Sequence, residues 1–218
     1  KESFVCKKME SNKYFPKVIF RQKDFIIQTC VKGKSLQVKR TDTKNEIAVY
    51  YDLGKTIKKL HQIKSRGWGE LLSNGNGKFK SLTTYIKSLA ITDNSVRNYL
   101  LDNAHLFDDD EIVLLHGDLT DGNIIVDKKE FSGIIDFGDA CVGYKEYDLA
   151  KVYLEKSKAV FEAFISGYSL KRLDMKKLDY MATFHLLYLI PFYVTRKENK
   201  KADRLAKKLA TIISNEPR

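Results

Sequence analysis

Three side chains that can carry phosphoryl-transfer chemistry occur in a fixed order in the middle of the chain. Asp118 and Asn123 lie in the segment HGDLTDGN, residues 116–123, and Asp136 ends a hydrophobic run further on. A carboxylate can orient a hydroxyl group and accept its proton. An Asn carbonyl oxygen and a second carboxylate suit magnesium, which prefers hard oxygen ligands and keeps several waters. The pattern predicts Asp118 as the catalytic group, with Asn123 and Asp136 as metal ligands, in phosphoryl transfer from a nucleotide.

Short hydrophobic runs predict the strands that must position these groups. Residues 112–115 precede the HGDLTDGN segment, residues 124–126 follow it, and residues 133–135 lead into Asp136. Apolar runs of this length, bounded by Gly and Asp, are typical of buried strands. The first two strands should hold Asp118 in a loop, and the third should present Asp136 at its end.

Neighbouring residues are expected to support the chemical groups rather than to react. His116 is predicted to be a hydrogen-bonding brace for the loop. Gly117 fits a tight turn, and Gly138 should free the chain just after Asp136, because glycine adopts backbone conformations that other residues avoid. Asp121 is interpreted as a turn former, as acidic residues beside glycines usually are.

The ordered motifs resemble the aminoglycoside phosphotransferase family, relatives of the choline kinases and of eukaryotic-type protein kinases. That family has HGD with four residues before Asn, a metal strand ending in Ile-Asp-Phe/Leu-Gly, and a downstream Asp-Leu-Ala that opens a helix. Residues 116–123, 134–138 and 148–150 match these motifs. The resemblance implies that Asp148 braces the catalytic loop. It also implies an α+β, protein-kinase-like fold with a small N-terminal lobe and a mainly helical C-terminal lobe.

The resemblance divides the chain into a remnant of the small lobe, residues 1–33, and a large catalytic and substrate-binding lobe, residues 34–218. Within the remnant, the pattern of apolar residues predicts a helix at residues 2–12 and paired strands at residues 18–20 and 24–30. In the family, this hairpin is the last part of the small lobe, and the connector after it is the hinge on which adenine lies.

Three residues of the remnant are expected to serve the nucleotide. By the resemblance, the backbone at Thr29 and Val31 would face adenine. Glu2 would occupy the place of the Glu that supports the site by pairing with a phosphate-gripping Lys. The Gly-rich loop and that Lys would precede residue 1, and the sequence contains no G-x-G-x-x-G pattern. The small lobe is therefore expected to be truncated.

The rest of the chain is predicted to be largely helical. Helices are expected at residues 46–63, 82–101, 149–166 and 176–213. The glycine-rich residues 66–77 are expected to form a loop near the substrate entrance, with Trp68 in the core. In the family, C-terminal helices build the acceptor pocket, and its candidate lining residues here are Tyr168, Tyr180, His185, Tyr188 and Tyr193.

Composition bounds the class of protein. The 218 residues are 43% hydrophobic and 31% charged, enough for one domain or two small lobes. The longest apolar stretch, residues 181–195, is too short to span a bilayer, so no membrane segment is expected. Three widely spaced cysteines give neither a disulfide framework nor a zinc pattern, which favours a cytoplasmic protein with each Cys buried or half-buried.

The net charge of +11 comes from 39 Lys and Arg against 28 Asp and Glu. Lysines are spread along the whole chain, so a solvated basic surface is favoured over a nucleic-acid interface, and no nucleic-acid partner is expected. A cationic aminoglycoside would favour an acidic pocket, and so basic a chain weakens that choice of substrate.

The sequence favours an ATP-dependent small-molecule kinase that uses Mg²⁺ and transfers the γ-phosphoryl group to a hydroxyl. The acceptor could be an aminoglycoside or other antibiotic, an amino alcohol or a sugar, and the donor ATP or GTP. Two alternatives stay open, namely a compact protein-kinase-like ATPase and an inactive fragment or pseudokinase that serves as a binding module. The oligomeric state is also open.

Overall fold

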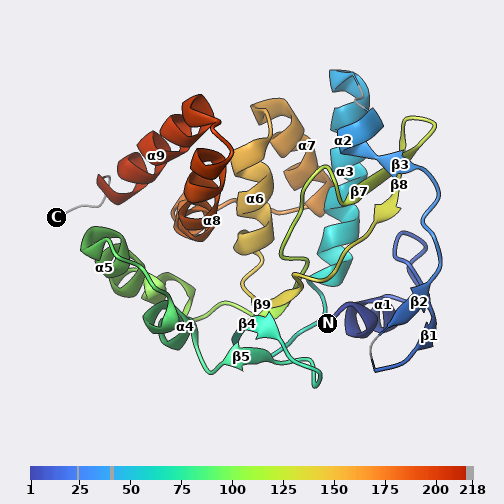
Figure 1. Ribbon diagram of the computed structural model, residues 1–218, viewed down its shortest axis with the longest axis horizontal. Helices are drawn as coiled ribbons and strands as arrows, with labels where there is room; N and C mark the ends of the chain where they lie inside the picture. Colours follow the sequence, from blue (N-terminus) through green and yellow to red (C-terminus); the bar gives the residue numbers. More distant parts are fainter. Residues whose placement is uncertain (24, 40–41, 215–218) are drawn as a thin grey trace.

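The structure is a computed structural model that describes residues 1–23, 25–39 and 42–214. Figure 1 shows the N-terminal elements, in blue, at one end of the molecule, and helices α8 (Met175–Thr195) and α9 (Asn199–Ser214) at the other. Small sheets and helices are combined, so the α+β class is confirmed.

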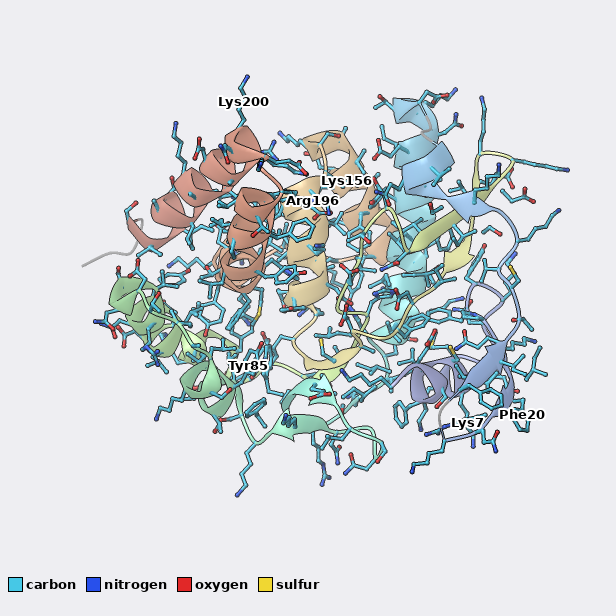
Figure 2. All side chains as sticks on the ribbon, in the orientation of Figure 1. Lys7, Phe20, Tyr85, Lys156, Arg196 and Lys200 are labelled. Carbon is cyan, nitrogen blue, oxygen red and sulfur yellow. The ribbon has the colours of Figure 1, made fainter. Side chains whose placement is uncertain are left out.

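The N-terminal part consists of α1 (Glu2–Lys8) and an antiparallel hairpin of β1 (Val18–Arg21) and β2 (Ile26–Gln28). Both the helix and the hairpin were predicted. The helix ends at Lys8 rather than at residue 12, and residues 9–11 form turns. Figure 2 shows Phe20 at the periphery of this hairpin. The predicted second strand began at Asp24, which lies outside the described residues.

A glycine joins this hairpin to the sheet whose last strand leads into Asp136. Gly33 has φ +130°, and a Cβ atom there would lie 2.3 Å from the carbonyl oxygen of Val126, so only glycine fits. The chain then enters β3 (Lys34–Ser35), which pairs with β7 (Ile124–Asp127), and β7 pairs with β8 (Glu130–Ile134). The connector after the hairpin is thereby fixed at Gly33 against β7, the strand that follows residues 116–123.

A second sheet, in the order β5-β4-β9-β6, carries the strand before that loop. Its strands are β4 (Trp68–Leu71), β5 (Gly77–Phe79), β6 (Val113–Leu115) and β9 (Cys141–Gly143). The expectation of a loop at residues 66–77 is therefore wrong. Trp68 and Leu71 are buried at the two ends of β4, and β4 completes its pairing through β9, some seventy residues away in sequence, which local periodicity does not reveal.

Helices cover these sheets. α3 (Thr43–Leu60) packs along α7 (Lys158–Tyr168), and α6 (Glu146–Glu155) packs against α8. α3 begins three residues before the predicted start, because the carboxylate of Asp42 accepts the N–H of Asn45 as an N-cap. It ends at Leu60, three residues before the predicted end. No helix in the described part of the chain has the length and apolar character needed to cross a membrane.

Three predicted helices are each divided in two. Residues 82–101 form α4 (Leu82–Ser88) and α5 (Asn94–Asp102), while residues 149–166 belong to α6 and α7, and residues 176–213 to α8 and α9. New helices start where a polar side chain accepts the first free backbone N–H groups, as Asp93 does for α5 and Ser157 for α7. These caps explain the breaks.

Candidate active site

The catalytic loop, residues 116–123, connects β6 to β7 and so joins two different sheets. Inside it, the side-chain amide of Asn123 donates to the backbone oxygen of Asp118 at 2.9 Å and to its carboxylate Oδ2 at 3.0 Å. The loop therefore brings two of the predicted site residues into direct contact. With its amide nitrogen committed to Asp118, Asn123 has its carbonyl Oδ1 available for a metal ion.

Asp136 lies two residues after the end of β8, with an exposed side chain whose Oδ1 accepts the N–H of Gly138 at 3.3 Å. The N–H of Ile135 donates to the carbonyl of Asn123 at 3.0 Å, so Asn123 and Asp136 lie at adjacent ends of paired strands. Asp136 itself has φ +64°, in the left-handed region, where we expected Gly138 to provide the conformational freedom. Such strained backbone concentrates at functional sites, and Asp tolerates it better than most residues.

The donor atoms available at these two strand ends suit magnesium. A carboxylate and an amide carbonyl are hard oxygen donors, and Mg²⁺ commonly takes one or two protein ligands, with phosphate oxygens and waters completing its coordination. Among the described residues, no group of three or more His, Cys, Asp or Glu side chains could hold a metal ion. The oxygen donors of Asn123 and Asp136 fit, by their chemistry, the few protein ligands that a nucleotide-bound Mg²⁺ takes.

His116 joins the catalytic loop to the Asp136 segment. Its Nδ1 accepts the N–H of Asp118 at 3.2 Å, and its Nε2 lies 3.1 Å from the carbonyl of Ile135. Burial lowers the pKa of His116, so the ring is neutral and Nε2–H donates to the carbonyl. Next to it, Gly117 has φ +86°, and a Cβ there would lie 2.1 Å from the carbonyl oxygen of Asp139. The tight turn expected at Gly117 is present.

Asp148, in the first turn of α6, holds the start of the loop from inside the core. Its carboxylate accepts the backbone N–H groups of His116 at 2.8 Å and of Gly117 at 3.0 Å. It also contacts Nε2 of His61 at 2.9 Å, and Nδ1 of His61 lies 3.0 Å from the hydroxyl of Tyr168. Burial alone would raise the pKa of Asp148, but the hydrogen bonds from His61 and from the N–H of Gly117 lower it below its usual value.

Asp121 provides a second point of support that the sequence interpretation missed. Its carboxylate accepts the hydroxyl of the buried Tyr50 at 2.8 Å and Nζ of Lys156 at 2.6 Å, and Lys156 also donates to Glu46 at 2.9 Å. Burial opposes the charge of Lys156, but its two carboxylate partners raise the pKa above its usual value. The turn-former interpretation was therefore incomplete, and no local pattern connects residues 50, 121 and 156.

A cavity of about 430 Å³ brings together the residues that the sequence predicts to bind the nucleotide, and we name it the nucleotide cavity. Glu2, Thr29 and Val31 line it with Asp136, although they come from α1, the hinge and the end of β8. Ile125 and Ile135 also line this cavity, and they offer apolar surface to a planar base. The sequence interpretation had assigned both isoleucines only to strands.

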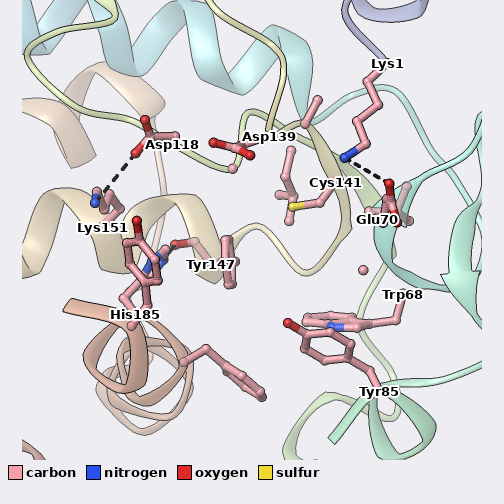
Figure 3. Close-up of a pocket in the computed structure, with 17 residues that line it drawn as sticks. Lys1, Trp68, Glu70, Tyr85, Asp118, Asp139, Cys141, Tyr147, Lys151 and His185 are labelled. Atoms are coloured by element: carbon pink, nitrogen blue, oxygen red, sulfur yellow. Dashed lines mark hydrogen bonds and ion pairs between the residues drawn. The ribbon is translucent and has the colours of Figure 1, made fainter. Parts of the chain in front are cut away.

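Asp118 faces a second cavity, of about 390 Å³, on the other side of the catalytic loop. Its aromatic lining residues are Trp68, Tyr85, Tyr147, Phe184 and Tyr188. Figure 3 shows Asp118 and Lys151 on one side of this cavity, the Lys1–Glu70 ion pair on the other, and the rings of Trp68 and Tyr85 close together. We name it the acceptor cavity, after the pocket that the sequence predicts.

Two of the five predicted acceptor-pocket residues, His185 and Tyr188, line this cavity. Tyr168, Tyr180 and Tyr193 are buried, and the hydroxyl of Tyr180 donates to a backbone carbonyl at 2.6 Å. Burial lowers the pKa of His185 to about 4, so the ring is neutral at pH 7 and donates through Nε2 to the carbonyl of Tyr147. His185 is therefore a poor candidate for a general base.

The three cysteines are free in the structure. Cys141 lines the acceptor cavity, but burial raises the pKa of its thiol well above the usual value. Cys6 is buried, as expected, whereas Cys30 is exposed, contrary to the expectation for all three cysteines.

Comparison with known proteins agrees with this geometry. A sequence model described as "Phosphotransferase enzyme family" matches residues 14–180. The crystal structure of aminoglycoside phosphotransferase APH(4)-Ia is similar at a TM-score of 0.74 and 16% identity, over 100% of this chain and 82% of that chain. No curated protein sequence matches the chain significantly.

Two further solved structures are similar over nearly the whole chain. The gentamicin-APH(2")-IIa complex has a TM-score of 0.62 at 20% identity, over 96% of this chain and 79% of that chain. Macrolide 2'-phosphotransferase MphH from Brachybacterium faecium has a TM-score of 0.61 at 14% identity, over 100% and 79%. At such identities the likeness concerns the fold, and the protein-kinase-like fold predicted from the motifs is confirmed.

Proposed function

Because this chain belongs to the phosphotransferase enzyme family, we propose that it transfers the γ-phosphoryl group of ATP to a hydroxyl group of a small molecule. One observation carries the proposal. Asp118 lines the acceptor cavity, Asp136 lines the nucleotide cavity, and Asn123 is hydrogen-bonded to the segments of both. The groups proposed to act on acceptor and donor thus face two cavities and are linked through the hydrogen bonds of Asn123.

In this proposal, Asp118 orients the acceptor hydroxyl and takes its proton as the oxygen attacks the γ-phosphorus. Asn123 fixes Oδ2 of Asp118 through its amide, so the carboxylate keeps one orientation while the hydroxyl approaches. Asn123 and Asp136 would hold Mg²⁺, which when bound neutralises charge on the phosphates. His116 and Asp148 keep the loop in place through hydrogen bonds and do not touch the reacting atoms.

The nucleotide cavity supports a purine donor. Ile125 and Ile135 would pack against the base, and the backbone at Thr29 and Val31 would bind its edge. Glu2 lines the same cavity from α1, where it would stand near the phosphates. Backbone recognition of this kind suits ATP or GTP. The division into residues 1–33 and 34–218 stays a prediction, and Gly33 is where we would place the boundary.

The acceptor cavity supports a hydroxylated ring compound of low charge. Of the three carboxylates that line it, those of Glu70 and Asp118 each lie within 4 Å of a lysine, which offsets their attraction for a polycation. The third, Asp139, leaves the lining with one net negative charge, from three carboxylates against Lys1 and Lys151. Aromatic rings such as Trp68 and Tyr85 offer flat surfaces that suit the apolar face of a sugar ring. We therefore favour a sugar or glycoside acceptor over a strongly cationic aminoglycoside.

The test is Asp118→Asn in an ATP-turnover assay with hygromycin B, gentamicin, a macrolide, choline and glucose as acceptors. We expect kcat to fall by about 10²–10⁴-fold, because the variant loses the proton acceptor while its shape is unchanged. Asp109→Asn, at an exposed carboxylate away from both cavities, is the matched control and should leave turnover unchanged. Undiminished turnover in Asp118→Asn would contradict the role of this group.

Calorimetry of ATP binding, with and without Mg²⁺, tests the nucleotide site separately. We expect wild-type binding to depend on magnesium and to weaken in Asp136→Asn. Mg²⁺-dependent binding without transfer to any small acceptor would favour a binding module. Transfer to a protein acceptor alone would favour the protein-kinase-like alternative.

A further inference from the structure

A lysine of α6 lies beside the proposed catalytic carboxylate. Nζ of Lys151 is 3.7 Å from Oδ1 of Asp118 and 3.2 Å from Oε1 of Glu155, one helical turn away. The Lys151 side chain is only 7% exposed, and it lines the acceptor cavity. Lysine is rarely so buried unless it has acidic partners, and the two carboxylates near Lys151 supply them.

Both oxygens of Asp118 thereby have a partner. Oδ2 accepts the amide of Asn123 at 3.0 Å, and Oδ1 faces the ammonium of Lys151. The 3.7 Å separation exceeds a direct hydrogen bond, so Oδ1 remains able to accept a proton from an acceptor hydroxyl. Glu155 binds the same ammonium more closely, which keeps it from closing onto the carboxylate.

Among the described residues that line the cavity, no other cation is placed to face Oδ1 of Asp118. The catalytic loop, residues 116–123, contains no Lys or Arg. Lys1 is paired with Glu70 at 3.2 Å on the opposite side of the cavity, as Figure 3 shows. His185 is neutral and donates to a backbone carbonyl. The ammonium of Lys151 is therefore the positive charge that acts on Asp118.

We propose that Lys151 is a positioning residue for Asp118, one that restrains the carboxylate toward the acceptor hydroxyl from the side opposite Asn123. The inference rests on the proposed phosphoryl transfer to a hydroxyl. Restraint from two sides matters because a displacement of about 1 Å at a reacting group can cost about 10²-fold in rate.

The test compares Lys151→Met with Lys158→Met. Lys158 also lies 3.7 Å from a carboxylate, that of Glu162, but its side chain is 89% exposed on α7, so it controls for loss of one lysine charge. Turnover is measured with ATP as donor and glucose, gentamicin or hygromycin B as acceptor, and ATP hydrolysis is followed with water as acceptor. For Lys151→Met we expect kcat to fall about 10²-fold with the KM for ATP within about twofold, and Lys158→Met to match the wild type.

Two further variants separate positioning from a merely structural role. Lys151→Arg keeps the charge and should recover most of the lost kcat. In an Asp118→Asn background, Lys151→Met should cause little further loss, because a residue that acts through Asp118 has nothing left to position. This double variant also separates the two roles if Lys151→Met is less stable than the wild type. A stability defect would lower the rate with Asp118 and with Asn at position 118, whereas a loss of positioning would lower it only with Asp118.

Each outcome has a distinct meaning. Unchanged kcat in Lys151→Met, or an equal loss with and without Asp118, overturns the role of Lys151 and leaves the proposed function standing. Absence of turnover in the wild type, with every acceptor and with water, overturns the proposed function and the role of Lys151 with it.

Discussion

The catalytic loop, residues 116–123, and the β1–β2 hairpin differ in how the rest of the chain supports them. The loop is held by Asp148 of α6 at its start and by Tyr50 of α3 and Lys156 through Asp121 further on. The hairpin pairs its two strands and leaves large apolar side chains exposed, namely Ile19, Phe20, Phe25 and Ile27. Figure 1 shows the loop's neighbours in the middle of the molecule and the hairpin at its edge.

This contrast shows where the sequence of such a protein is constrained. In the proposed reaction a carboxylate must be placed closely against a hydroxyl, and buried hydrogen-bond networks can hold it there. A nucleotide base that is held by backbone groups depends on the path of the backbone rather than on particular side chains. We therefore expect substitutions around the loop to cost far more than substitutions on the exposed face of the hairpin.

The largest effect is expected for Asp148→Ala. The backbone N–H groups of His116 and Gly117, and the ring of His61, would lose a charged acceptor inside the core. The free energy of unfolding should fall by about 3–5 kcal/mol, measured by urea denaturation. Asp109→Ala, at an exposed position, is the control and should change it little. A loss below about 1 kcal/mol for Asp148→Ala would mean that the loop is not held from α6.

The next effect depends on pH and concerns His185, whose pKa is lowered from 6.5 to about 4 in the folded protein. Between these values the unfolded chain binds more protons than the folded one, so stability falls as the pH is lowered from 6.5 to 4. The loss attributable to this residue should reach about 3 kcal/mol near pH 4. Urea denaturation of wild type and His185→Gln at pH 7 and pH 4 measures it. If the free energy of unfolding changes equally with pH in the two proteins, the lowered pKa of His185 is contradicted.

A smaller effect is expected where a single hydroxyl supports the loop. Tyr50→Phe removes the donor to Asp121 and should lower the free energy of unfolding by about 2 kcal/mol, since hydrogen bonds to charged groups are the stronger ones. Tyr51→Phe, at the half-exposed neighbouring position, is the matched control. If the two variants are equally stable in thermal and urea denaturation, Asp121 is held by Lys156 alone.

The smallest effect should occur on the hairpin. Phe20→Ala, at a side chain 48% exposed, should change the free energy of unfolding by no more than about 0.5 kcal/mol. Phe15→Ala gives the contrast within the same region, because Phe15 is buried and stacks on Phe137 with ring centroids 5.3 Å apart, so its truncation should cost about 3–5 kcal/mol. A large loss for Phe20→Ala would show that the exposed face of the hairpin is covered in solution.

The sequence predicted well those features that depend on neighbours in the chain. The strands around the catalytic loop, the hairpin at residues 18–30 and the helix that begins near Asp148 follow from short apolar runs and ordered motifs. The sequence-based prediction failed where interacting residues are distant in the chain. β4 completes its pairing with β9 across the chain, and the breaks within predicted helices depend on capping residues that periodicity averages over.

By itself, the sequence determined the family, and residue type and spacing predicted Asp118, Asn123 and Asp136 as the chemical groups. Only the tertiary structure decided which residues surround them. Lys151 meets Asp118, and Tyr50 and Lys156 meet Asp121, through helices that are distant in sequence. The physical reason is that spacing along a chain fixes the order of groups, whereas the packing of helices against sheets fixes which groups come within a few ångströms of each other.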